Sequence, residues 1–341
     1  MQPYCFTEET STNFGDDLNR WLWPRLLPEQ MQQQDDILFC GIGTILGKGL
    51  PAAGHYVVFS SGAGYGPPTP GFGGDKWSIV CVRGPLTAQV LNLPPSKAAA
   101  DGALLLASFP ELKPLPEAER SGVVFMPHYE NLPSGDWAEI CRRAGVELLS
   151  PHLPSEEAVE KIRGSRLVLA DAMHAAIVAD AMRVPWVPLI ASNRINTFKW
   201  LDWTLTLNLP YRPLTLPAPT LMEAVQDRGR VLTDDSFTLD DKTRASALGD
   251  FMRRRKLRDH RHWPSYRRLA VRVVRGVPNR VLRSRALSQA VEGNTAMRLD
   301  LTAAALQAAA KSTSYLSDDN VFFGKVDLLL SKLEEVKVLR A

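Results

Sequence analysis

The sequence predicts an α/β fold built from two successive units, followed by a helical region. In about the first hundred residues, short apolar runs end in turns rich in glycine or aspartate, and stretches with helical periodicity follow them. A second series of apolar runs and helical stretches begins at Val123, whereas beyond about Leu221 the pattern is helical only. Runs that are apolar on both faces and alternate with helices are typical of parallel sheets covered on each side.

Chain length and a proline-rich stretch set the expected domain boundaries. With 341 residues the chain exceeds the usual ceiling for a single hydrophobic core. Residues 108–122, SFPELKPLPEAERSG, are rich in proline and charge and are typical of a linker. We therefore expect two Rossmann-like domains, at residues 1–115 and 116–215, facing a cleft, and a helical extension at residues 216–341.

Composition and cysteine usage indicate a cytoplasmic protein. The apolar fraction of 45% is ordinary for a globular chain, and the N-terminus turns polar and acidic after six residues instead of forming a secretory signal. No apolar run approaches the ~18 residues that a membrane-spanning helix needs. The four cysteines stand singly, without a CxxC pair, so we expect reduced thiols and neither disulfides nor a metal site.

The net charge of +3 hides one strongly basic segment. Residues 253–285 contain thirteen Lys or Arg and one acid, which leaves 27 bases and 36 acids elsewhere. Arginines interleaved with Leu, Val, Trp and Tyr are typical of an amphipathic helix at an anionic membrane surface. A solvated helical face that pairs with the acidic body and a nucleic-acid contact are the alternatives, but no nucleic-acid-binding signature accompanies the charges.

Two glycine-rich turns in the first half can bring backbone amides close to a ligand. Gly43 belongs to the turn GIG, and Ser61, Gly62 and Gly64 belong to SSGAG. Turns of this kind admit a phosphate or a sugar because no Cβ blocks the backbone. Neither turn matches the dinucleotide fingerprint or the P-loop, so NAD and ATP sites are not supported.

Residues 166–189 predict a strand, a sharp turn, a helix and a second strand. Asp171 is a suitable N-cap, which places His174 at the third helical position, and the helix continues to Met182. A helix start attracts anions, and an imidazole beside it can act as an acid or a base. The alternative is that His174 only packs or caps the helix.

The next segment combines aromatic side chains with cations. Trp200 and Trp203 lie near Arg194 and Lys199. Tryptophan faces stack on sugars, and the cations would suit an acidic group. Burial of both tryptophans between the domains is the alternative.

Seven motifs, in order and spacing, resemble the polysaccharide pyruvyl transferases, most closely the ketal-forming enzymes of succinoglycan-type exopolysaccharide synthesis. The likeness runs from about residue 4 to residue 215. Its motifs are NFGDDLN (13–19), GIGTIL (41–46), SSGAG (60–64), VRGPLT (82–87), DGALLL (101–106), MPH (126–128) and LADAMHAAIVADAMRVPWVPL (169–189).

The resemblance implies a cytosolic enzyme with a two-domain fold like that of the GT-B glycosyltransferases. Such an enzyme transfers the carboxyvinyl unit of phosphoenolpyruvate onto two hydroxyls of a sugar, which gives a cyclic pyruvate ketal and phosphate, with no cofactor. We expect a lipid-linked exopolysaccharide repeat as the acceptor. The enzyme would then work peripherally at the inner face of the plasma membrane, which it approaches through residues 253–285.

The resemblance also implies a functional pair, a histidine in the second-domain turn and an arginine in the VR turn, which match His174 and Arg83. Ala172 and Met173 stand where other members have Arg and Leu, so Lys199, Arg194 or Arg166 would have to supply a phosphate-binding charge. An arginine fork binds a carboxylate or a phosphate bidentately. We therefore expect Arg83 to hold the donor and His174 to act as acid or base.

Four further residues are expected near the substrate. Asn13 and Asp16 would bind sugar hydroxyls, or else serve only turn and cap chemistry. Asp171 would orient the ring of His174, or else only cap the helix. His128 ends a predicted strand and would face the cleft, where a catalytic, a binding and a structural role are equally compatible with the sequence.

Two other classes of protein fit the same pattern. A nucleotide-sugar glycosyltransferase of the same architecture and pathway would bind a nucleotide diphosphate sugar and not phosphoenolpyruvate. A scaffold protein of polymer assembly would retain its function after His174→Ala.

Overall fold

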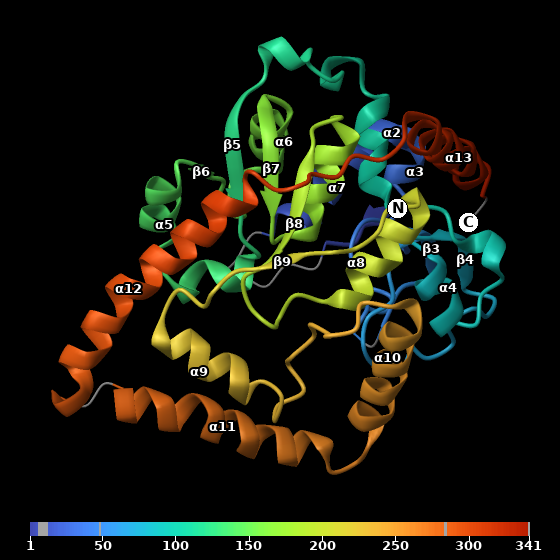
Figure 1. Ribbon diagram of the computed structural model, residues 1–341. Coiled ribbons are helices and arrows are strands. Elements are labelled where there is room, and N and C mark those ends of the chain that lie inside the picture. Colours follow the sequence, from blue (N-terminus) through green and yellow to red (C-terminus); the bar gives the residue numbers. More distant parts are fainter. Residues whose placement is uncertain (6–12, 48, 283–284, 340–341) are drawn as a thin grey trace.

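Two parallel sheets form the centre of the molecule (Figure 1). The computed structural model describes residues 1–5, 13–47, 49–282 and 285–339. The first sheet has the order β1-β2-β3-β4, with strands β1 (Gln2–Pro3), β2 (Ile37–Cys40), β3 (His55–Ser61) and β4 (Trp77–Val82). The second has the order β6-β5-β7-β8-β9, with strands β5 (Ser121–Met126), β6 (Glu147–Leu148), β7 (Ser165–Ala170), β8 (Trp186–Ile190) and β9 (Leu214–Thr215). The predicted α/β class with parallel sheets is confirmed.

The first unit contains fewer helices between its strands than the sequence pattern predicts. After β1 come the short helices α1 (Phe14–Asp17), α2 (Asn19–Leu26) and α3 (Glu29–Gln32), and after β4 comes α4 (Pro85–Val90). Among the described residues, β2 and β3 are followed by loops and no helix. Glycine and proline, which crowd both loops, have the lowest helix propensities, so the expected helices at these two places were wrong.

The C-terminal helix covers part of the first sheet. Helix α13 (Asp319–Lys337) packs against β4 and against a 3-10 segment, Gly102–Ser108, that follows the first sheet (Figure 1). Its buried side chains are spaced along one helical face: Phe322, Val326, Leu329, Leu333 and Val336. The end of the helical region therefore stabilises the first unit.

The second unit follows the sequence prediction closely. Helix α5 (Trp137–Ala144) begins at its N-cap Asp136 and ends at Gly145, whose φ of 70° is left-handed. Helix α6 (Ser155–Arg163) precedes β7, and helix α7 (Met173–Ala181) follows it. Interior strand β7 pairs with β5 on one side and β8 on the other, which explains why its sequence is a continuous apolar run.

The predicted helical C-terminal region is confirmed. After α8 (Thr197–Thr204) the chain forms α9 (Leu221–Gly229), α10 (Arg244–Asp259), α11 (Trp263–Leu282) and α12 (Arg285–Ala309). Helix α12 packs along α5, and α11 packs against α9 (Figure 1). Over the described residues, every helix is too short or too polar to cross a lipid bilayer.

Candidate active site

Loops from both units enclose a cavity of about 310 Å³ at the carboxyl ends of the two sheets. Loops after β2, β3, β5, β7 and β8 contribute to its wall, as expected of ligand sites in parallel α/β sheets. Ten candidate residues named from the sequence line it: Asn13, Asp16, Gly43, Gly64, His128, Asp171, His174, Arg194, Lys199 and Trp200.

Ser61, Gly62 and Arg83 lie behind the wall of the cavity. The hydroxyl of Ser61 donates to the carbonyl oxygens of Cys40 and Gly41 and so holds β3 to the end of β2. A Cβ at Gly62 would overlap the guanidinium of Arg83, so this glycine makes room for the arginine. In this structure Arg83 therefore does not present its guanidinium to the cavity.

Arg83 forms a buried ion pair that joins the two units. Its Nε lies 3.1 Å from Oδ2 of Asp202 on α8, and both side chains are fully buried. Its Nη1 donates to the hydroxyl of Thr44 at 3.1 Å, whereas its buried Nη2 lacks a hydrogen-bond partner within the described part of the chain. Thr44 lines the cavity, and α8 also carries Lys199. Arg83 thus links Thr44 in the cavity wall to the helix that carries Lys199.

Helix α7 begins one residue later than the sequence predicts. Ala172 occupies the N-cap position with an extended backbone, so His174 is the second helical residue and not the third. The carboxylate of Asp171 does not cap the helix. It accepts hydrogen bonds of 2.8 Å from the backbone N–H groups of His128 and Ala191 and from the side chain of Asn131.

The contacts of Asp171 therefore correct both expected roles. Its carboxylate ties the ends of three strands together, because its partners follow β5 and β8 while it follows β7. Burial raises the pKa of Asp171 to about 6, against the opposing effect of its three donors. No hydrogen bond or ion pair joins it to His174 within the described residues, so the expected orientation of that ring by Asp171 is not seen.

The carboxylate nearest to His174 belongs to Asp101, which sequence reasoning missed. Nε2 of His174 and Oδ2 of Asp101 are 3.8 Å apart, and neither atom has a hydrogen-bond partner in the described structure. The other carboxylate oxygen of Asp101 caps the following 3-10 segment through the N–H of Ala103. Burial would raise the pKa of Asp101, but His174 and the positive charge of Arg83 outweigh burial and lower it.

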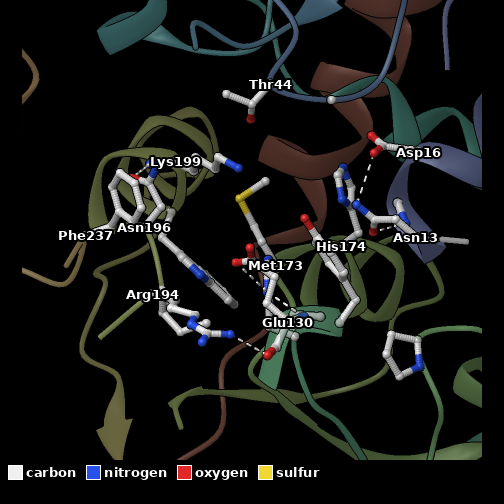
Figure 2. Close-up of a pocket in the computed structure, with 18 of the residues that line it drawn as sticks. Asn13, Asp16, Thr44, Glu130, Met173, His174, Arg194, Asn196, Lys199 and Phe237 are labelled. Atoms are coloured by element: carbon white, nitrogen blue, oxygen red, sulfur yellow. Dashed lines mark hydrogen bonds and ion pairs between the residues drawn. The ribbon is translucent and has the colours of Figure 1, made fainter. Parts of the chain in front are cut away.

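The short helix α1 packs against the ring of His174. Asn13 is the N-cap of α1, and its Nδ2 donates to Oδ2 of Asp16 at 3.0 Å. Figure 2 shows Asn13 and Asp16 beside the imidazole. Burial is the largest effect on Asp16 and raises its pKa to about 6, so its carboxyl can exchange a proton near neutral pH.

Cations occupy the opposite wall. The ammonium of Lys199 points into the cavity, with Arg194 below it (Figure 2). Within the described residues, Lys199 Nζ makes no hydrogen bond or ion pair, and burial lowers its pKa. Nη1 of Arg194 donates to the carbonyl oxygen of Glu130 at 2.6 Å. An unpaired ammonium that faces a cavity is suited to an anionic ligand.

His128 also lines the cavity. Burial lowers its pKa to about 3, and the charges of Lys199 and Arg194 act in the same direction. Its Nδ1 accepts the backbone N–H of Glu130 at 3.4 Å. At neutral pH, His128 is therefore an uncharged group with one ring nitrogen engaged.

The basic segment reaches the cavity through Arg258, which sequence reasoning also missed. Arg258 pairs with Asp234 at 3.1 Å and lies 5.3 Å from the centre of the Tyr65 ring and 5.5 Å from that of Phe237. The only indication of this arginine in the sequence is the excess of basic residues in segment 253–285. No local motif distinguishes this arginine from its neighbours.

The two tryptophans are interior residues. Trp203 is fully buried and Trp200 is 2% exposed, and both pack against Trp186. Trp200 also stacks on Tyr211, so its face is not available to a sugar. Of the two predicted roles, burial is therefore the one observed, although one edge of Trp200 reaches the cavity.

Cations that face an imidazole and a protonatable carboxyl, at the strand ends of parallel sheets, are the arrangement of a group-transfer enzyme. Residues 11–193 match the family model described as polysaccharide pyruvyl transferase, and the chain belongs to this family. It is also 40% identical, over 226 residues that cover 66% of this chain and 71% of the relative, to the "Succinoglycan biosynthesis protein ExoV" of Rhizobium meliloti (strain 1021). No solved structure gives a significant match.

The family match confirms the resemblance predicted from the motifs. The protein is an enzyme, a polysaccharide pyruvyl transferase, and the family implies a polysaccharide acceptor. Among the described side chains, no group of three or more His, Cys, Asp or Glu is arranged to hold a metal ion.

Proposed function

We propose that the protein transfers the carboxyvinyl unit of phosphoenolpyruvate onto two hydroxyls of a sugar in a lipid-linked exopolysaccharide repeat, forming a cyclic ketal. The observation that carries this proposal is the unpaired ammonium of Lys199 across the cavity from His174 and Asp16. The relative named for succinoglycan biosynthesis supports an exopolysaccharide pathway of that type.

Two sheets whose strand ends share one cavity are what a GT-B-like pair of Rossmann-like domains would give. In such an arrangement each unit binds one of the two substrates. The loops of the second unit would hold the anionic donor, and α1 with the glycine turn at Gly43 would face the sugar.

The donor fits the cationic wall. Phosphoenolpyruvate carries a carboxylate and a phosphate, and Lys199 and Arg194 offer two positive groups that face the same space. The start of α7 adds backbone N–H groups and the positive end of a helix dipole. We place the phosphate between Lys199 and this helix start.

The reaction needs one acid and one base. An acid in the cavity protonates the methylene carbon of phosphoenolpyruvate, which leaves its C2 electron-poor. One sugar hydroxyl adds to C2 and loses its proton, then the C2–O bond to phosphate breaks and the second hydroxyl adds. Of the two hydroxyl protons, one restores the acid and the other leaves with phosphate.

His174 and Asp16 are the residues for these proton transfers. Asp16, with a pKa near 6, can carry the proton destined for the methylene carbon. His174 can accept a hydroxyl proton and pass it to the leaving phosphate, while the Asp101 carboxylate behind it stabilises the imidazolium that forms. The other hydroxyl proton returns to Asp16, so both groups end the reaction in their starting protonation states.

In this proposal Arg83 is a positioning residue. Its guanidinium holds Thr44 in the cavity wall and, through Asp202, the helix that carries Lys199. A fixed position of Lys199 is needed for a small dianion to bind in a reactive geometry.

A direct test incubates the protein with phosphoenolpyruvate and lipid-linked oligosaccharide acceptors and measures released phosphate and the mass of the acceptor. We expect equal amounts of phosphate and ketal. Lys199→Met should raise the KM for phosphoenolpyruvate by roughly tenfold to a hundredfold, because a charge-assisted contact is lost. His174→Ala should abolish turnover. Tight binding of a nucleotide diphosphate sugar, without phosphate release from phosphoenolpyruvate, would identify a glycosyltransferase instead.

A further inference from the structure

Helix α11 exposes an apolar stripe. Tyr266, Leu269 and Val273 are 50%, 62% and 51% exposed, and their spacing of three and four residues places them on one face of the helix. A neighbouring face is turned inward, where Val274 packs against Gly229 of α9. The stripe therefore is not required for packing against α9.

Arginines flank this stripe. Arg268 and Arg272 are exposed on the same side of α11, and neither forms a salt bridge within the described residues. This contrasts with α10, where Arg254 and Arg258 turn inward to pair with Asp234. Among the described side chains of the basic segment, Arg254 and Arg258 thus turn inward to an acid, whereas Arg268 and Arg272 are exposed without one.

The apolar surface extends beyond the helix. Val231 and Leu232, 68% and 56% exposed, line a shallow hollow together with Tyr266 and Arg253. Arg253 itself pairs with Asp234 and Asp250. Large apolar side chains beside the arginines of α11 are the composition of a surface that sits at the headgroup layer of an anionic bilayer.

A second polar cavity lies between the inner side of α11 and the active-site cavity. Val271, Val274 and Arg267 of α11 form one side of a cavity of about 160 Å³. Glu130, Arg194 and Phe237 line both this cavity and the active-site cavity. The two cavities therefore adjoin at Glu130, Arg194 and Phe237.

We propose that the outer face of α11, formed by Tyr266, Arg268, Leu269, Arg272 and Val273, docks on an anionic lipid surface. The sugar of a lipid-linked acceptor would then enter the active site by way of the cavity between α11 and the active site. This route rests on the proposed function, but the docking itself does not depend on catalysis. The apolar stripe inserts among the headgroups, and the arginines bind lipid phosphates.

The test is sedimentation of the full chain with vesicles of phosphatidylcholine alone and of phosphatidylcholine with phosphatidylglycerol. We expect binding to the anionic vesicles only, and a loss of binding as salt is raised. Arg268→Gln with Arg272→Gln should weaken binding roughly tenfold or more, since each arginine near an anionic surface contributes about a factor of five. Leu269→Gln with Val273→Gln should weaken it similarly.

Matched controls separate docking from general effects of charge and apolar exposure. Phe323→Gln on α13 removes an apolar side chain that is 45% exposed, and Arg142→Gln on α5 removes a charge from a side chain that is 72% exposed. Neither change should affect vesicle binding. Circular dichroism and phosphate release with a water-soluble acceptor verify that the α11 variants are folded and active.

Three outcomes would overturn the proposal. The first is equal sedimentation with neutral and anionic vesicles, and the second is binding that the α11 variants leave unchanged. The third is dimerisation of the wild type that the same variants abolish, because the stripe would then be the contact between two copies. If the vesicles bind as expected but phosphoenolpyruvate is not consumed, docking stands and the proposed reaction fails.

Discussion

Gly15 lies directly against the imidazole of His174, so closely that a Cβ at residue 15 would overlap the ring at Nδ1. The contact joins α1 of the first unit to the start of α7 in the second. It places the ring between the backbone of α1 on one side and the carboxylate of Asp101 near Nε2 on the other. The position of this histidine is therefore set by residues far from it in the chain.

Replacing this glycine tests the contact. In Gly15→Ala the methyl group must displace either the imidazole or α1, and a shift of about 1 Å in a reacting group can lower turnover roughly a hundredfold. We expect that loss in kcat, measured as phosphate release. Gly249→Ala is the matched control, because no atom lies near its Cβ position on exposed α10, and it should leave kcat unchanged. Full activity of Gly15→Ala would contradict the observed packing.

The carboxylate of Asp101 is expected to support His174 through its charge. Asp101→Asn keeps an oxygen that can cap the 3-10 segment at Ala103 but removes the negative charge next to Nε2. We expect kcat to fall roughly tenfold to a thousandfold, with little change in the KM for phosphoenolpyruvate, because the carboxylate stabilises an imidazolium formed only during reaction. Asp101→Ala, which also removes the cap, should in addition lower the melting temperature. A change confined to KM would exclude this role.

The second unit and its histidine were predictable because their signals are local. The strand at Ser165–Ala170, the turn and the helix around His174 are contiguous, so apolar periodicity alone places an imidazole at the end of a strand. The prediction that Asp171 is the N-cap was wrong because the hydrogen-bond partners of its carboxylate are not local. Its carboxylate finds donors on two other strand ends, and a local capping rule does not include such partners.

The rest of the site depends on contacts between distant residues. Asp101 and Thr44 belong to motifs that were noticed, yet nothing in those motifs shows which side chain approaches His174 or Arg83. Arg258 comes from a segment interpreted as a surface helix, and its inward direction follows from Asp234, which is far from any motif. The buried pairing of Arg83 with Asp202 likewise joins residues 119 positions apart.

The buried ion pair of Arg83 with Asp202 predicts a large effect on stability. Arg83→Met leaves the carboxylate of Asp202 buried without its ion-pair partner, and removal of one member of a buried pair costs about 3–5 kcal/mol. We expect urea unfolding to show a loss of this size. Arg83→Met combined with Asp202→Asn should recover part of the loss, because the Asn oxygen still accepts from the start of α4 while the buried charge is gone. Additive losses in the double variant would contradict the coupling.

The buried carboxyl of Asp16 predicts a pH dependence with a definite sign. Its pKa is about 6 in the folded protein, raised mainly by burial, whereas the unfolded chain ionises it near 4. The folded state therefore binds the proton more tightly, and the contribution of Asp16 to the free energy of unfolding falls as the pH rises from about 4 to 6. Asp16→Asn keeps an oxygen that accepts the hydrogen bond from Asn13, but it does not ionise. The variant therefore lacks this decrease in the free energy of unfolding. The variant should thus be more stable relative to wild type at pH 7 than at pH 4, as measured by urea unfolding. A difference in stability that does not vary over this range would show that the carboxyl is not held in an unfavourable ionised state.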